Sequence, residues 1–382
     1  GGGARGLGIP NVVDRMVQEA VRRVLEPVYE QTFHDQSHGF RPGRGCHTAI
    51  DLAREYLEDG YEWVVDLDLE KFFDRVNHQR LVARLTQRVT DKRLLWLIGK
   101  MLKAAVVLPD GVKVATDEGV PQGGPLSPLL SNIVLDELDA ELVRRGHRFV
   151  RYADDCNIYV SSERAGQRVM ISISQFIERR LRLKVNGSKS AVARPETRHF
   201  LGYQLGCQQS WDGTVDIQLS ARSKERLKAK VRELTPRNWG NSTVACITQI
   251  NAYTRGWFAH FGICTSGVKR VLGQTDGHIR RRLRAIQLKQ WKRKLTIARR
   301  LITLGIRRPK AFDVVYSGRK SLWTLSNVRP VVYALSNAHW AAKGFKPLLA
   351  QWQAIDSKRD APRQLTLFGD RARLQPSRDA GK

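Results

Sequence analysis

Residues 149–160 read FVRYADDCNIYV, a run of aromatic and β-branched residues with two adjacent aspartates, Asp154 and Asp155, near its centre. The run predicts two short strands joined by a turn at the aspartates, because Asp is a common turn residue. A second acidic pair, Asp66 and Asp68, stands in the strand-like stretch YEWVVDLDL. Carboxylates on strands are costly unless they are paired or bind a cation, although a plain hairpin turn explains Asp154 and Asp155 equally well.

Bound magnesium would explain acids in both stretches. Mg²⁺ takes oxygen ligands from carboxylates and from substrate phosphates at the same time. Two such ions about 3.5–4 Å apart can activate a 3′-hydroxyl and stabilise a leaving pyrophosphate. The acids therefore favour in-line nucleotidyl transfer as the reaction.

The sequence around these stretches mixes helical and strand patterns. Apolar residues recur at helical spacing in residues 12–33, 46–59, 77–86, 91–103, 125–145 and 164–181. Strand patterns lie in residues 106–120, near Ala191 and in residues 199–205. Helices mixed with antiparallel hairpins predict an α+β fold for this part of the chain.

Charge divides the chain of 382 residues into two parts. Residues 1–220 carry 30 basic and 29 acidic side chains, whereas residues 221–382 carry 35 and 8. A nearly neutral module followed by a strongly basic one indicates a polyanionic partner for the second. In that second part, residues 223–234, 244–261 and 278–304 have helical patterns, and we expect most of its aromatic rings to pack in a core.

Cysteine use and hydropathy argue against other classes. The five cysteines are odd in number and form no C-x-x-C pair. A disulfide scaffold and a structural zinc site are therefore unsupported, and a reducing compartment fits best. No run reaches the roughly 18 apolar residues that a membrane span needs, so no membrane partner is expected.

Several ordered motifs resemble the reverse transcriptases of bacterial group II introns. FVRYADDCNIYV resembles their metal-binding hairpin, VVDLDLEKFFDRVNH their first metal-binding motif, and GVPQGGPLSPLLSNIVLDELD their long PQG motif. RGLGIPNVVDRMVQEAVRRVLEPVYEQTFHDQSHGFRPGRGCHTAI resembles the finger motifs, and LKVNGSKSAV and HFLGYQL resemble the last palm motifs. NAYTRGWFAHFG and HIRRRLRAIQLKQWKRK resemble the maturase, or thumb, region, so the resemblance covers residues 4–355.

This resemblance implies a right-hand polymerase. Residues 1–219 would form the fingers and a palm with an antiparallel sheet, and residues 220–320 a helical thumb or maturase domain. A C-terminal helical region that binds nucleic acid would occupy residues 321–356, followed by a flexible tail at 357–382. We expect the start of the fingers to be missing and no endonuclease domain to be present.

The family's catalytic residues correspond to particular positions here. Asp68, Asp154 and Asp155 would be the catalytic carboxylates and would hold two Mg²⁺ ions, together with the backbone at Leu69. Asp66 is expected to be structural and to pair with basic or backbone groups. Lys189 would protonate the pyrophosphate, and an ordinary exposed lysine remains the alternative.

The resemblance also implies a nucleotide site and a primer support. Arg5 and Arg15 would bind the triphosphate, Phe73 would exclude a 2′-hydroxyl, and Gln122 would contact the nucleotide near its sugar and base. The hairpin Phe200, Leu201, Gly202 and Tyr203 would support the primer end. For each of these residues, core packing or a surface position remains open.

The basic part would grip structured RNA. Its expected RNA-binding residues are Arg280, Arg281, Arg282, Arg284, Lys292, Arg293 and Lys294. The implied function is an RNA-directed DNA polymerase and maturase in the bacterial cytoplasm, associated with the nucleoid when on DNA. Its partners would be group II intron RNA, an RNA template with a DNA primer, target DNA and dNTPs, with the oligomeric state open. The alternatives are an RNA-binding splicing factor with a vestigial polymerase and a retron or CRISPR-linked reverse transcriptase.

Overall fold

The computed structural model describes residues 10–104, 106–107, 113–114, 118–120, 123–209, 214–236, 240–318 and 321–360. The chain splits into two compact units, Gly1–Ser223 and Lys224–Lys382. Arg5, Gln122 and residues 361–382 of the expected tail lie outside the described residues.

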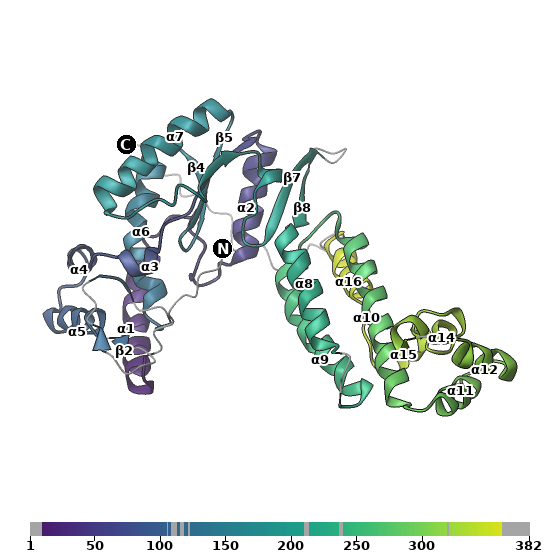
Figure 1. Ribbon diagram of the computed structural model, residues 1–382. Coiled ribbons are helices and arrows are strands. Elements are labelled where there is room, and N and C mark those ends of the chain that lie inside the picture. Colours follow the sequence, from purple (N-terminus) through teal and green to yellow (C-terminus); the bar gives the residue numbers. More distant parts are fainter. Residues whose placement is uncertain are drawn as a thin grey trace, which may run out of the picture. The chain divides into compact units, whose positions relative to one another are not determined.

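A four-stranded antiparallel sheet forms the centre of the first unit (Figure 1). Its strands, in spatial order, are β4 (Arg148–Tyr152), β5 (Asp155–Val160), β1 (Trp63–Leu67) and β6 (Ala191–Ala193). Val64 lies opposite Tyr159, and Asp66 lies opposite Asn157. Since opposed residues of an antiparallel pair share a face, this register decides which side chains meet. The expected α+β fold is confirmed.

Helices pack around this sheet, and two hairpins form separate two-stranded sheets. The helices are α1 (Val12–Glu30), α2 (Cys46–Glu58), α3 (Phe72–Arg75), α4 (His78–Thr86), α5 (Lys92–Leu102), α6 (Ser127–Arg144) and α7 (Glu163–Phe176). A π-helical turn (Ile177–Leu181) continues α7, and a 3₁₀ turn occupies Pro195–Thr197. The hairpins pair β2 (Val106–Val107) with β3 (Lys113–Val114), and β7 (Tyr203–Gln209) with β8 (Val215–Leu219).

Helices α7 and α2 cover opposite faces of the sheet. A Cβ at Gly166 of α7 would lie 2.5 Å from the Val192 Cγ1 and 3.4 Å from the Val160 Cγ2, so α7 can approach this closely only because it carries glycine there. On the other side, the Tyr56 ring of α2 lies 5.6 Å from the Tyr159 ring. Neighbouring strand residues point to opposite faces of the sheet. Val160 therefore faces α7, and Tyr159 faces α2.

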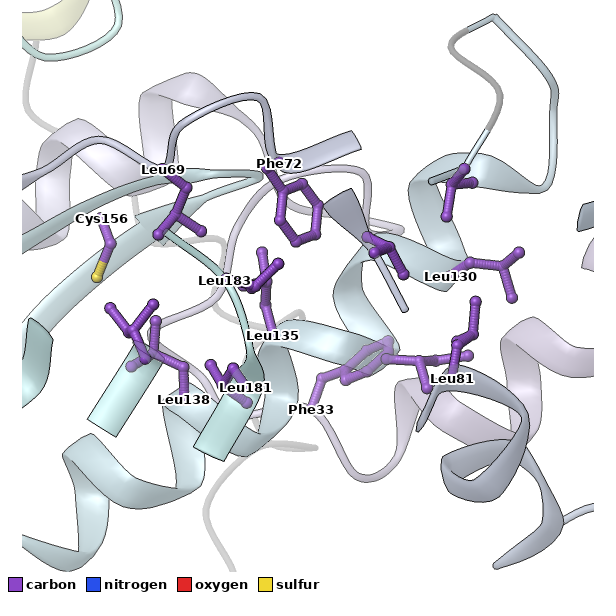
Figure 2. Packing of buried hydrophobic residues seen from close by; sticks show 14 of the residues in the cluster. Phe33, Leu69, Phe72, Leu81, Leu130, Leu135, Leu138, Cys156, Leu181 and Leu183 are labelled. Carbon is purple, nitrogen blue, oxygen red and sulfur yellow. The ribbon is translucent and has the colours of Figure 1, made fainter. Parts of the chain in front are cut away.

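A hydrophobic core of the first unit lies on the α7 side of the sheet and extends to α6 (Figure 2). Ile50 and Ala53 of α2 are buried on the opposite side. It includes Leu135 and Leu138 of α6 and Leu181 beyond α7. Leu67 and Leu69 are also buried in it, with 1% and 6% of their surface exposed. Burial of both neighbours anchors Asp68, the residue between them.

Two sequence expectations are wrong in detail. The hairpin turn between β4 and β5 consists of Ala153 and Asp154, while Asp155 already belongs to β5. Residues 199–205 are not one strand, because Phe200 and Tyr203 close a tight turn before β7 runs on. Alternation of apolar residues does not separate a strand from such a turn.

The second unit is helical throughout its described residues. Its helices are α8 (Ala221–Leu234), which begins in the first unit, α9 (Thr243–Phe261), α10 (Val268–Gln290), α11 (Lys294–Thr303), α12 (Arg308–Tyr316), α13 (Leu322–Leu325), α14 (Arg329–Ala334), α15 (Asn337–Ala342) and α16 (Leu348–Asp360). Trp257, Phe258, Trp340, Phe345 and Trp352 are buried, but Phe261, Trp291 and Trp323 are only half-buried and Tyr316 and Tyr333 are exposed. The expectation that most rings of this part are core is therefore met only in part. Among the described helices, none combines the length and apolarity needed to cross a membrane.

The expectation of a single helix over residues 278–304 is wrong. The structure has α10 and α11 instead, separated by a break in which Lys292 has a φ of 58°. No glycine or proline marks this left-handed residue, so the sequence pattern runs through it. Helix α16 also continues to Asp360, three residues past the expected start of the tail at 357.

Candidate active site

The antiparallel register brings acids from two segments to the same end of the sheet. Leu67 of β1 lies opposite Cys156 of β5, so Asp68 and Asp155, the residues next to this pair, lie close together at the same end of the two strands. Because side chains alternate along a strand, Asp66, Asp68 and Asp155 project from the face opposite that covered by α7. Asp155 is exposed and Asp154 is half-buried.

Residues 186–190 pack against Asp68 and bring Lys189 to it. The Lys189 Nζ lies 3.4 Å from both carboxylate oxygens of Asp68. The Asp68 backbone N–H donates to the Ser190 Oγ at 3.0 Å, and its carbonyl accepts from the Asn186 N–H at 2.8 Å. The Lys189 side chain is 54% exposed, so the ion pair itself contributes little stability, and the backbone bonds hold the loop.

Asp66 is held by an arginine that sequence reasoning missed. The Arg198 Nε and Nη2 donate to the Asp66 Oδ2 at 2.9 and 2.5 Å, and Nη2 also donates to the Lys189 carbonyl at 2.5 Å. The expected pairing of Asp66 with a basic group is thus confirmed. Burial raises the pKa of Asp66 even though Arg198 opposes that shift.

The donors at this site suit a hard cation. Asp68, Asp154 and Asp155 offer carboxylate oxygens, and Leu69 is fixed beside them by its bridge to Val185. Within the described part of the chain, no three acidic, His or Cys side chains converge on a preformed metal cage. Mg²⁺ commonly binds through one or two carboxylates plus substrate phosphates and keeps several waters. The oxygen donors therefore fit Mg²⁺ in a site that substrate would complete.

The helix that carries Phe73 is attached to the segment leading to the PQG motif. Phe73 is half-buried and contacts Phe72 edge-on, with ring centroids 5.2 Å apart. The Val120 N–H donates to the Phe73 carbonyl at 2.6 Å, and the His78 Nε2 lies 2.6 Å from the Gly119 carbonyl. A Cβ at Gly119 would lie 2.9 Å from the Phe73 carbonyl oxygen, and its φ is +96°, so this contact requires glycine.

The expected primer support is a tight turn. Phe200 and Tyr203 exchange two backbone hydrogen bonds of 2.9 Å, and Leu201 and Gly202 form the tip with φ values of 52° and 87°. Both rings are buried. The structure therefore places the aromatic rings in the core, while Leu201 and Gly202 at the tip are half-buried. Arg15, expected at the triphosphate, is exposed on the first turns of α1.

The seven expected RNA-binding residues differ in exposure. Lys292, Arg293 and Lys294 are exposed where α10 ends and α11 begins, while Arg280, Arg281 and Arg282 are partly buried. The Arg281 guanidinium lies 4.0 Å from the Trp323 ring centroid, and the Arg282 Nε donates to the Thr235 carbonyl at 2.8 Å.

Arg284 has a packing role instead. It is 6% exposed, and its Nε donates to the Ser326 carbonyl at 2.7 Å. Burial, together with Arg280 and Arg281, lowers its pKa to about 10. Arg284 is therefore not on the exposed surface where we expected it to meet RNA.

Residues 36–38 form an additional edge beside β4. The His38 N–H donates to the Arg151 carbonyl at 2.8 Å, and the Arg151 N–H donates to the Gln36 carbonyl at 2.9 Å. The His38 Nδ1 lies 2.8 Å from the Thr48 Oγ1. The finger-like segment SHGF is thus fixed to the strand that leads to Asp154.

Two family models match successive parts of this chain. Residues 1–205 match the model described as reverse transcriptase (RNA-dependent DNA polymerase). Residues 224–302 match the model described as group II intron, maturase-specific domain. The boundary between the two matches falls where the structure divides into its two units.

Named proteins resemble the chain over part of its length. Protein YkfC of Escherichia coli (strain K12) is 32% identical, with 62% of this chain and 72% of YkfC covered. The group II intron-encoded protein LtrA of Lactococcus lactis subsp. cremoris is 32% identical, with 61% of this chain and 49% of LtrA covered, so the matched region spans about half of LtrA. Among solved structures, telomerase from Candida albicans in complex with a telomeric RNA fragment is 13% identical at a TM-score of 0.45, covering 90% of this chain and 58% of telomerase.

Replacing His38 by glutamine is expected to reduce the loss of stability in acid. Burial, together with the nearby Arg44 and Arg41, lowers the pKa of His38 from an ordinary value of 6.5 to about 4. The unfolded chain therefore takes up a proton that the folded chain resists. The resulting stabilisation is full above pH 6.5 and shrinks by up to about 3 kcal/mol as the pH falls toward 4.

The measurement is the free energy of unfolding of wild type and His38→Gln by denaturant titration between pH 7 and pH 4. The difference between the two proteins should shrink or change sign across this range. Two curves that stay parallel would contradict a buried, neutral His38.

Proposed function

Because the chain belongs to the reverse transcriptase family and carries a group II intron maturase-specific domain, we propose that it copies intron RNA into DNA and helps that RNA to splice. The adjacency of Asp68 and Asp155 at the end of the β1–β5 pair is the observation that carries the polymerase part. Its expected substrates are dNTPs and an RNA template with a DNA primer.

The chemistry of the site would be nucleotidyl transfer. Asp68, Asp154 and Asp155 would hold two Mg²⁺ ions, and the Leu69 backbone would help. When bound, these ions would activate the primer hydroxyl and stabilise the leaving pyrophosphate. Lys189, 3.4 Å from Asp68 and more than half exposed, could donate a proton to the pyrophosphate as it leaves.

Nucleotide selection would fall to the helix α3 and its neighbours. Phe73 would stand against the sugar and exclude a 2′-hydroxyl, and the hydrogen bond from the Val120 N–H to its carbonyl would fix its position. Gln122 would contact the nucleotide near its sugar and base. Arg15, with its exposed guanidinium, would bind triphosphate oxygens, as Arg5 would.

The second unit would supply the maturase function. The exposed residues Lys292, Arg293 and Lys294 would contact phosphates of the intron RNA, and target DNA would be a further partner. Phosphate contacts of this kind give affinity that falls as salt rises. Arg280, Arg281 and Arg282 would shape this surface more than they contact RNA.

Alanine at both Asp154 and Asp155 should abolish DNA synthesis. Loss of two of the three carboxylates removes most of the proposed metal ligands, so we expect a drop of about 10³-fold or more. The assay is primer extension on an RNA template with Mg²⁺ and dNTPs. Asp51→Ala, which removes an exposed acid of α2, is the control and should retain activity. A wild-type protein that binds and splices intron RNA without making DNA would leave only the splicing-factor alternative.

Alanine at Phe73 should relax the choice between deoxyribonucleotides and ribonucleotides. Removing the ring opens space for the 2′-hydroxyl, and we expect incorporation of ribonucleotides relative to dNTPs to rise roughly 10- to 100-fold. Single-nucleotide extension with matched dNTP and rNTP measures the ratio. Trp96→Ala, which removes a ring that is 64% exposed on α5, should leave it unchanged. The same ratio in Phe73→Ala and wild type would refute the role.

Glutamine at Lys292, Arg293 and Lys294 should weaken RNA binding and its salt dependence. Each lost phosphate contact lowers the slope of log affinity against log salt by about 0.7–0.9, so three contacts predict a decrease of roughly 2–3. Filter binding of intron RNA across a salt series measures it. The control removes Lys228 and Lys230, whose charges are paired with Glu225 and Glu233. Equal slopes for both variants would argue against this surface.

A further inference from the structure

Arg151, the fourth residue of β4, has a guanidinium with no exposed surface. Its Nε and Nη2 donate to the two carboxylate oxygens of Asp139 at 2.7 and 2.6 Å. Its Nη2 also donates to the Ser37 Oγ at 2.6 Å. Its Nη1 donates to the Asn132 Oδ1 and to the Ala153 carbonyl, both at 3.0 Å. All three nitrogens are thus in use, and one of the bonds reaches the turn itself.

Ala153 is the residue at which these contacts converge. It has a φ of 56°, in the left-handed region that residues with a Cβ rarely adopt. Such a conformation is strained and persists only where the surroundings impose it. The Arg151 guanidinium holds the Ala153 carbonyl.

Gly39 packs against the same turn. A Cβ at Gly39 would lie 2.4 Å from the Ala153 nitrogen and 3.1 Å from the Tyr152 carbonyl carbon. The Gly39 carbonyl in turn accepts from the Asn132 Nδ2 at 2.8 Å. Asn132 therefore links Gly39 and Arg151: its amide nitrogen donates to Gly39, and its amide oxygen accepts from Arg151.

We propose that Arg151, Asn132 and Gly39 form a clamp that holds the Ala153–Asp154 turn in its metal-binding geometry before substrate arrives. The inference rests on the proposed polymerase function for the identity of the site. The three are positioning residues, because Arg151 and Gly39 contact the turn, Asn132 connects these two, and none of them would touch the reacting atoms. Adjacent carboxylates repel one another, so a hairpin with Asp154 in its turn and Asp155 at the start of β5 needs support that does not depend on a bound cation.

The buried ion pair supports this interpretation. Burying a charged pair is often no more stabilising than apolar packing of the same volume, so stability alone does not explain Arg151 and Asp139. An arginine offers several directed donors, and here they reach α6, residue 37 and the turn together. The packing of three separate segments around Arg151 therefore fixes the position of the Ala153 carbonyl.

The sharpest test is Gly39→Ala with Gly45→Ala as the matched control. Gly39 does not have a left-handed φ, so its methyl group acts by displacing the turn. A Cβ at Gly45, in the same segment, meets nothing within 4 Å. We expect Gly39→Ala to weaken Mn²⁺ binding, measured by titration calorimetry, about tenfold or more. Amide hydrogen exchange in the peptide containing Ala153 should accelerate, while Gly45→Ala behaves as wild type.

Arg151→Lys provides a second variant. Lysine can still pair with Asp139, but it loses the fork that also reaches Ala153 and Asn132, so the metal affinity and the exchange rate should change in the same direction as for Gly39→Ala. Circular dichroism confirms that each variant is folded. A folded Gly39→Ala protein that binds Mn²⁺ and exchanges its amide hydrogens as the wild type does would overturn the clamp, whether or not DNA synthesis is normal. A wild-type protein that makes no DNA would instead overturn the proposed function, and these two measurements would still decide the clamp.

Discussion

One buried guanidinium connects the parts of the first unit that have to meet at the active site. Arg151 contacts α6 through Asp139 and Asn132, the segment before α2 through Ser37, and its own hairpin through Ala153. Burial opposes the charge of this group, but the attraction of Asp139 outweighs it and raises the pKa of Arg151. The arginine therefore stays charged. The surrounding segments have to place their hydrogen-bond acceptors in a single arrangement that matches its N–H groups.

The sequence predicts the parts of the site that follow local patterns. Acids in strand-like runs locate Asp68, Asp154 and Asp155. The register of β1 against β5, which joins distant parts of the sequence, is what places Asp68 and Asp155 on one face. Contacts between distant segments leave no such pattern. Arg198 meets Asp66 across 132 residues of sequence. Arg151 stands within the motif that decides the fold, yet nothing local shows that its side chain points into the core rather than toward solvent.

In the helical part, the sequence predicts the charge of the surface in the same limited way. A run of cations predicts a basic surface, but it does not tell which members face solvent. Arg284 satisfies the helical pattern of its neighbours and is nevertheless buried against Ser326. Lys292, Arg293 and Lys294 owe their exposure to a break after α10 that a left-handed lysine produces without glycine or proline. Tertiary packing decides both outcomes, so composition alone cannot.

The pleat of β5 has a consequence for the choice of metal. Cys156 directly follows Asp155, but alternation turns its thiol into the core, where burial raises its pKa and keeps it protonated. A thiolate is a soft ligand that favours zinc and copper(I), whereas carboxylate oxygens are hard and favour magnesium. The strand therefore separates a soft donor from a hard one at successive positions. A shift of one residue in the register would exchange them and would offer the site to a different class of cation.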